Sequence, residues 1–246
     1  MRGDGTVIAG KARGGRTVYG GAVGVLMLET RFPRIPGDMG NALTWPFPMH
    51  FKVVRGASPD RVVRQQADGL LDAFKEAANE LVEAGADGLT TTCGFLSLMQ
   101  GELAEHVRVP VATSSLQQVS MVNATLPPRQ RCGVVTVSAP DLTPAHLAAA
   151  GAPPDTPVVG TENGRELSRV MVGDEPELDV LAAEADVVEA SLALLGADAT
   201  VGALVLECTN MPPYAAAVQR ATGVPVYDIV SFICWFQSGL RPRGFA

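Results

Sequence analysis

Two cysteines of this 246-residue chain, Cys93 and Cys208, occupy similar positions in the sequence. Each ends a short run typical of a buried strand and precedes a turn that leads into a helix. Free backbone N–H groups and the helix dipole at such a position favour the thiolate. We therefore expect a lowered thiol pKa and acid–base chemistry at both residues.

The surroundings of the two cysteines repeat along the chain. Sixteen residues after the first cysteine begins Val109-Pro110-Val111, and sixteen residues after the second begins Val224-Pro225-Val226, so both features are offset by 115 residues. Upstream, Gly85-Ala86-Asp87 matches Gly196-Ala197-Asp198, with a gap to the cysteine that is four residues longer in the second copy. The common order indicates an internal duplication, which favours functional thiols over buried structural ones.

Two equivalent acid–base groups on opposite faces of one carbon atom are what inversion of a stereocentre by proton transfer requires. One cysteine, as thiolate, removes a proton from one face, and the other, as thiol, donates a proton to the opposite face. Two thiolates would repel each other, so the pair is expected to share one proton at rest. The carbanion next to a carboxylate needs stabilisation, for which helix N-termini and Thr92, Thr209 and Asn210 offer donors.

Apolar runs that alternate with helical patterns predict the elements that position these residues. Strands are expected in the runs that end at the two cysteines and at 25–28, 51–54, 109–112, 132–137 and 158–159. Helices are expected after Asp141 and at 58–84, 96–106, 115–126, 176–195 and 229–237. The alternation predicts an α/β protein with mainly parallel sheets, in which ligands bind outside the carboxyl ends of the strands.

The duplication predicts two similar three-layer α/β halves related by pseudo-twofold symmetry, with the active site in the cleft between them. We expect a flexible N-terminal arm over 1–21, a first half over 22–127 with the first cysteine, and a second half over 128–246 with the second. Two adjacent prolines mark the join, and the C-terminal helix is expected to pack back. The proline-rich segment 29–51 is long for a loop and is expected to cover the site.

Composition and spacing argue against several classes of protein. A net charge of −7 and a pI near 5.0 disfavour nucleic acid as a partner. The four cysteines show neither the spacing of a zinc site nor the density of a disulfide scaffold, the three histidines show no metal spacing, and Cys132 and Cys234 are interpreted as core residues. There is no apolar run long enough for a membrane span and no signal peptide pattern, so the cytoplasm is the default location.

Three further interpretations are disfavoured. The glycines at 20, 21 and 24 precede a strand, whereas a dinucleotide-binding loop follows one. The lysines that could form a pyridoxal Schiff base do not lie in glycine-rich turns; they are Lys11, Lys52 and Lys75. A Cys–His protease would leave the second cysteine unexplained.

The segments Thr92–Phe95 and Glu207–Pro212, together with the duplication, resemble the cysteine motifs of the aspartate/glutamate racemase superfamily, and the resemblance covers roughly 23–231. It implies two α/β halves, no cofactor, and Cys93 and Cys208 as the base and acid pair. It also places the end of the first strand, Glu29 to Arg31, and the residues after each cysteine at the substrate site. With one residue from the long loop, the predicted substrate-binding residues are Thr92, Gly94, Phe95, Thr209, Asn210, Glu29 and Asn41.

Differences from glutamate racemases bear on the substrate. Those enzymes typically carry His where this chain has Asn210 and Cys-Asn-Thr where it has Cys93-Gly94-Phe95, which weighs against glutamate itself. We favour a cofactor-independent isomerase that racemises or epimerises a small carboxylate such as aspartate, glutamate or a hydantoin. A maleate-type cis–trans isomerase, a related decarboxylase and a binding homologue without turnover remain open, as does a homo-oligomeric state. Decarboxylases keep one cysteine of the pair, so the retention of both favours racemisation or isomerisation.

Overall fold

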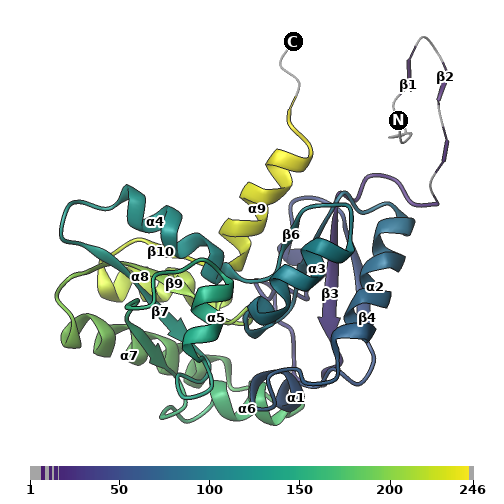
Figure 1. The fold of residues 1–246 in the computed structure, drawn as a ribbon. Coiled ribbons are helices and arrows are strands. Elements are labelled where there is room, and N and C mark those ends of the chain that lie inside the picture. Colours follow the sequence, from purple (N-terminus) through teal and green to yellow (C-terminus); the bar gives the residue numbers. More distant parts are fainter. Residues whose placement is uncertain (1–6, 9–10, 13, 16, 244–246) are drawn as a thin grey trace.

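The computed structural model describes residues 7–8, 11–12, 14–15 and 17–243, and its core consists of two four-stranded parallel sheets (Figure 1). The first sheet has the order β4-β3-β5-β6 and contains β3 (Val23–Leu28), β4 (Met49–Val54), β5 (Gly88–Thr91) and β6 (Val111–Ala112). The second sheet has the order β10-β9-β7-β8 and contains β7 (Arg131–Thr136), β8 (Val158–Gly160), β9 (Val201–Leu206) and β10 (Val226–Tyr227). The predicted α/β class with parallel sheets is confirmed.

The two sheets repeat each other in order and in register. Leu89 pairs with Val111 in the first sheet and Leu204 pairs with Val226 in the second, so both partners are displaced by the 115 residues seen in the sequence. The backbone N–H of Leu89 donates to Pro110 at 2.9 Å, and that of Leu204 donates to Pro225 at 2.9 Å. The duplication read from the sequence therefore extends to individual backbone hydrogen bonds.

Helices cover the sheets in the alternating order that the sequence predicts. They are α1 (Pro59–Val63), α2 (Leu71–Ala84), α3 (Gln100–His106), α4 (Val119–Thr125), α5 (Pro144–Ala149), α6 (Leu167–Gly173), α7 (Val180–Ala197), α8 (Ala215–Thr222) and α9 (Ile229–Leu240). Short 3₁₀ helices are η1 (Ala42–Thr44), η2 (Gly94–Met99), η3 (Ser115–Gln118) and η4 (Pro212–Tyr214). Helix α6 was not predicted, and η2 and η3 run directly into α3 and α4.

The single helix predicted over 58–84 is wrong, because the chain breaks into α1 and α2. Ser58 caps α1 through a hydrogen bond from Arg61 N, and Gly85 ends α2 with a φ of 126°, as expected for these residue types. Between the two helices, Gln66 and Ala67 have φ values of 53° and 57°, in the left-handed region that no α-helix contains. The apolar spacing continues across the break because both helices bury one face against the same core.

Alternating residues of β3 point to opposite faces of the first sheet. Leu26 and Leu28 belong to the large core that contains α2, whereas Val23 and Val25 belong to a smaller core with Phe232 and neighbouring residues of α9. Side chains of α9 also approach the backbone of β5 so closely that a Cβ at position 88 would lie 2.8 Å from the ring of Phe236. The C-terminal helix thus closes one face of the first sheet.

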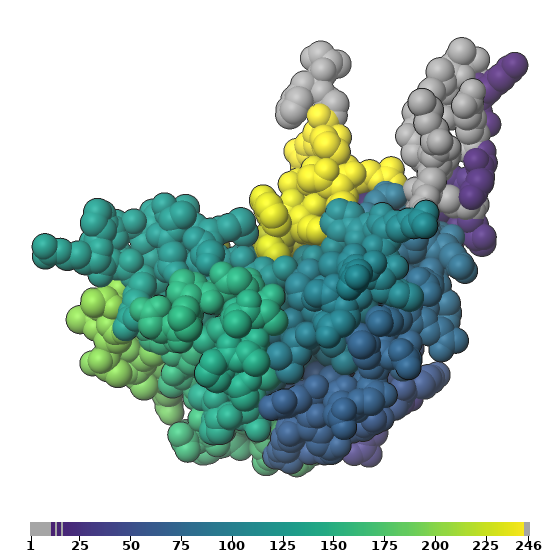
Figure 2. Space-filling model, in the orientation of Figure 1, coloured from purple at the N-terminus to yellow at the C-terminus, as the bar shows by residue number. Residues whose placement is uncertain are grey.

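A reciprocal contact comes from η3, whose Ser115 Oγ donates to the carbonyl of Leu206 in β9 at 2.9 Å. Each sheet is therefore covered in part by a helix that follows the last strand of the other sheet. On the face shown in Figure 2, residues around the first sheet (blue) and the second (green) meet along a continuous seam, and α9 (yellow) rises beside it. The predicted domain boundaries remain predictions.

The arm predicted over 1–21 lies partly outside the described residues. Within the described part, Val7–Ile8 and Lys11–Ala12 form a short antiparallel pair, where the composition predicted no regular structure. Among the helices of the described residues, none has the length and apolar character needed to cross a membrane.

Candidate active site

Both cysteines line one cavity at the carboxyl ends of four strands. Leu28 is the last residue of β3, Thr92 follows β5, Val137 follows β7 and Glu207 follows β9, and all four contribute to its wall. The cavity measures about 30 Å³, enough for water but not for a substrate of several carbon atoms. The remaining lining residues are Phe32, Pro59, Val63, Cys93, Gly94, Phe95, Met171, Val172, Cys208, Thr209 and Asn210.

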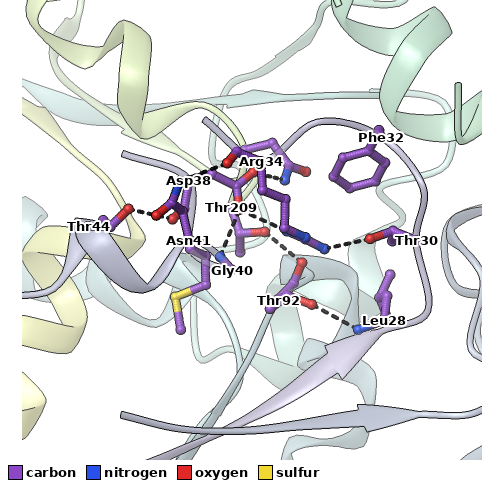
Figure 3. A network of polar contacts seen from close by, with 12 residues as sticks. Leu28, Thr30, Phe32, Arg34, Asp38, Gly40, Asn41, Thr44, Thr92 and Thr209 are labelled. Atoms are coloured by element: carbon purple, nitrogen blue, oxygen red, sulfur yellow. Dashed lines mark hydrogen bonds and ion pairs between the residues drawn. The ribbon is translucent and has the colours of Figure 1, made fainter. Parts of the chain in front are cut away.

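Hydrogen bonds tie the two cysteine motifs together. Thr209 Oγ1 donates to the carbonyl of Thr92 at 2.6 Å, and Thr92 Oγ1 accepts from Leu28 N at 2.9 Å (Figure 3). The long loop joins them through Met39 N, which donates to the carbonyl of Thr209 at 3.1 Å. The thiol-bearing turns, which are far apart in sequence, are thereby held against each other and against the loop.

The first turn depends on the glycine at position 94. Cys93 precedes η2, and the backbone N–H groups of Phe95 and Leu96 favour its thiolate. A Cβ at Gly94 would collide with Oε1 of Glu207. The same Cβ would also lie 2.8 Å from the backbone oxygen of Glu207, so the two motifs constrain each other sterically.

The expectation of a lowered thiol pKa is wrong for both cysteines. Burial raises the pKa of Cys93 to about 12, with a further contribution from the negative charge of Glu207. The same two causes raise the pKa of Cys208 well above its ordinary value. The backbone N–H groups at the starts of the turns act in the expected direction, but loss of solvent and the neighbouring carboxylate outweigh them.

Glu207 is the main functional candidate that sequence reasoning missed. Its side chain is fully buried, Oε2 accepts from Thr136 Oγ1 at 2.7 Å, and no described residue hydrogen-bonds Oε1. Burial raises its pKa to about 7, partly offset by the Thr136 hydrogen bond. A signal was available, since this glutamate interrupts the apolar run directly before Cys208.

A second polar network reaches Cys208 from the long loop. Cys208 Sγ donates to Asn210 Oδ1 at 3.4 Å, and Asn210 Nδ2 donates to Asp38 Oδ2 at 2.5 Å. Asp38 is 2% exposed and accepts from Arg34 Nη1 at 2.8 Å on its other oxygen (Figure 3). The Arg34 guanidinium lies 4.7 Å from the ring centre of Phe32, which lines the cavity, and its charge acts to lower the pKa of Cys93.

The structure brings five of the seven predicted substrate-binding residues to the cavity wall, namely Thr92, Gly94, Phe95, Thr209 and Asn210. The other two lie elsewhere. Glu29 pairs with Arg55 at the surface and accepts from Gly56 N, which together lower its carboxyl pKa. Asn41 caps η1 by accepting from Leu43 N. Local turn chemistry therefore accounts for the loop asparagine.

The other two cysteines lie away from this cavity. Cys132 is buried in β7 and Cys234 is half-buried in α9, and neither lines the cavity. Within the described ranges, no group of three or more His, Cys, Asp or Glu side chains is placed to share a metal ion.

The sequence relatives of this chain are lyases. It is 26% identical over 232 residues to a dimethylsulfoniopropionate lyase of Durusdinium sp. clade D, and this alignment covers 90% of this chain and 76% of that protein. It is 27% identical over 219 residues to dimethylsulfoniopropionate lyase 6 of Emiliania huxleyi (strain CCMP1516), and this alignment covers 85% of this chain and 57% of that protein. The chain thus spans little more than half of the Emiliania protein. No protein-family model matches the chain.

Solved structures with similar folds include racemases and a decarboxylase. Allantoin racemase from Klebsiella pneumoniae aligns with a TM-score of 0.66 and 19% identity, over 89% of this chain and 87% of that chain. A mutant of arylmalonate decarboxylase aligns with a TM-score of 0.62 and 16% identity, over 91% of this chain and 94% of that chain. A glutamate racemase from Bacillus anthracis aligns with a TM-score of 0.58 and 15% identity, over 89% of this chain and 81% of that chain. These neighbours are members of the aspartate/glutamate racemase superfamily, so the resemblance is confirmed at the level of the fold.

Proposed function

We propose that this chain is an enzyme that removes a proton from the carbon next to the carboxylate of a small molecule, with a cysteine as the base and without a cofactor. The observation that carries the proposal is the placement of two thiols and a buried carboxyl group around one cavity. The fold of the racemase and decarboxylase neighbours supports the same step, because racemisation creates a carbanion next to a carboxylate.

We propose further that the carbanion decays by elimination, as in a carbon–sulfur lyase. The relatives support dimethylsulfoniopropionate, or a carboxylate with a similar β-sulfonium group, as the substrate. A cysteine thiolate takes the α-proton, the electron pair of that C–H bond forms the double bond, and the bond from the β-carbon to sulfur breaks. Dimethyl sulfide leaves as a neutral molecule with the electron pair of the broken bond, and acrylate remains.

The cavity wall offers groups for both charges of such a substrate. The rings of Phe32 and Phe95 line the cavity and can stabilise a sulfonium cation. The Thr92 hydroxyl accepts from Leu28 N and can still donate its own proton to a substrate carboxylate. The small volume of the cavity means that its walls must separate before a substrate enters.

Racemisation or epimerisation is the second candidate, and the presence of both cysteines favours it. A racemase must run equally well from either face of its substrate, so it needs two comparable acid–base groups. The two thiols here have different surroundings, because Glu207 directly precedes Cys208 while Thr92 precedes Cys93. This asymmetry favours a reaction that uses one face, which is why we place elimination first.

The two candidates predict different products. The purified chain is incubated with dimethylsulfoniopropionate, and dimethyl sulfide and acrylate are measured; a Cys93→Ala/Cys208→Ala double variant serves as the blank. In parallel, enantiopure amino acids and hydantoins are incubated in heavy water and examined for deuterium at the α-carbon. Dimethyl sulfide above the blank supports the lyase, and deuterium exchange with inversion supports the racemase. Absence of both, in a folded protein, contradicts the proposed proton removal for these substrates.

A further inference from the structure

Glu207 has a placement that the fold alone does not require. It follows β9, its side chain lines the cavity, and it lies between the two motifs, next to Cys208 in the chain and against Gly94, which follows Cys93. One carboxyl oxygen is held by Thr136, and the other has no hydrogen-bond partner among the described residues. A buried carboxyl oxygen without a partner is costly, so its presence calls for a chemical explanation.

The duplication supplies an internal comparison for this position. Thr92 N donates to Leu26 O at 3.0 Å, and Glu207 N donates to Val135 O at 2.8 Å, so the two residues occupy equivalent backbone positions. In the first motif a hydroxyl completes the turn by accepting from Leu28 N. A small uncharged side chain at this position is therefore enough to form the turn. The turn does not need the carboxyl group of Glu207.

The other ionisable groups near the thiols are either uncharged or already paired. The two thiols are uncharged near neutrality because burial raises their pKa. Asp38 forms an ion pair with Arg34 and also accepts from Asn210, and burial raises the pKa of Tyr214. Among the described residues around the thiols, only Glu207 both lines the cavity and has a carboxyl oxygen without a hydrogen bond.

We propose that Glu207 is an acid–base partner of the two cysteines, which accepts the proton that a thiol releases and returns it to solvent after the product leaves. This rests on the proposed function. The carboxylate takes the proton from a cysteine Sγ, and the resulting thiolate takes the α-proton of the substrate. Elimination converts a zwitterion into acrylate, neutral dimethyl sulfide and one proton. That net proton resides on Glu207 until the cavity opens. A cationic substrate in the cavity favours formation of the thiolate.

The first test is the Glu207→Gln variant, which keeps the size of the side chain and an acceptor for Thr136. We expect turnover to fall by at least about 100-fold, the lower range for an acid–base group. The pH profile of the wild-type enzyme should contain an inflection near pH 7 that the variant lacks. Turnover within about threefold of the wild type, with the inflection retained, would overturn the proposal.

A second test does not depend on the substrate. The rate at which iodoacetamide alkylates Cys93 is measured against pH in the wild type and in Glu207→Gln. Removing the negative charge should lower the thiol pKa and increase the rate at about pH 8 to 9. An unchanged alkylation profile would overturn the partnership between Glu207 and the thiols, even if the enzyme acts on another substrate. A shifted profile would support it, even if dimethylsulfoniopropionate is not converted.

Asp186→Asn is the matched control, because Asp186 is a buried carboxylate with a structural role. It accepts from the backbone N–H groups of Arg165, Glu166 and Leu167 and does not line the cavity. We expect this control to lower the melting temperature without moving the pH inflection or the alkylation profile. Should Glu207→Gln fail to fold, Glu207→Asp keeps the charge and should retain the inflection at a lower rate. Loss of the inflection in Glu207→Asp would count against the proposal.

Discussion

The two cysteine motifs share a backbone but differ in what surrounds the sulfur. Cys93 is partly exposed and is favoured as a thiolate by two backbone N–H groups and by the charge of Arg34. Cys208 is buried, is favoured by the N–H of Asn210 alone, and is opposed by the charges of Glu207, Cys93 and Asp38. The duplicated scaffold therefore supplies two thiols at comparable positions in unequal electrostatic surroundings. Under the proposed function, this inequality favours one thiol as the base, with the other contributing to its environment.

The largest expected effect comes from removing the thiols one at a time. Cys93→Ala should lower turnover by about 1,000-fold, within the range for loss of a general base. Cys208→Ala should lower it by about 10-fold if the reaction is an elimination on one face. Product formation under saturating substrate measures both. Equal losses in the two variants would contradict the asymmetry and favour racemisation.

The second effect concerns stability and pH. The pKa of Glu207 is about 7 in the folded chain against 4.5 for the exposed group, so the folded state holds a proton that the unfolded state loses between these values. Stability should fall as the pH rises from about 4.5 to about 7, by about 3 kcal/mol, and stay level above that range. Urea unfolding at several pH values measures the fall, which Glu207→Gln should lack. An identical pH dependence in the variant would show that the carboxyl group does not titrate in this way.

The third effect tests the steric link between the motifs. Gly94→Ala places a Cβ against Glu207 Oε1 and should lower the free energy of unfolding by about 1 to 3 kcal/mol, as overpacking does. Gly101→Ala is the matched control, since a Cβ there meets no atom within 4 Å and it lies in helix α3. The control should be neutral or stabilising by up to about 1 kcal/mol. Urea unfolding compares the two, and equal stability would contradict close packing of the motifs.

The smallest effect concerns the ion pair beside the cavity. Asp174 accepts from the backbone N–H of Arg31 at 2.6 Å and forms an exposed ion pair with its guanidinium at 3.3 Å. It follows α6, which lines the cavity together with its neighbour α1. Asp174→Asn should change stability by less than about 1 kcal/mol, as exposed pairs do, and should speed alkylation of Cys93 a few-fold if these walls separate for entry. An unchanged rate would place the entrance elsewhere.

Much of the fold and part of the site could be read from local sequence signals. The strands that end at the cysteines, the Ser58 cap, the Gly85 stop and the offset of 115 residues depend on neighbours along the chain, and the structure contains all of them. The break between α1 and α2 escaped prediction, because the apolar spacing continues through residues whose backbone is left-handed.

What only the tertiary structure decided is the chemical state of the site. A thiol at the start of a helical turn has a lowered pKa when it is solvated, and the sequence alone supports that expectation for both cysteines. The folded chain reverses it, because burial and the charge of Glu207 act on both sulfurs at once. Glu207 in turn is hydrogen-bonded by Thr136 and packs against Gly94, which are 71 and 113 residues away. Burial and through-space charge depend on which distant segments meet, and no local pattern encodes that.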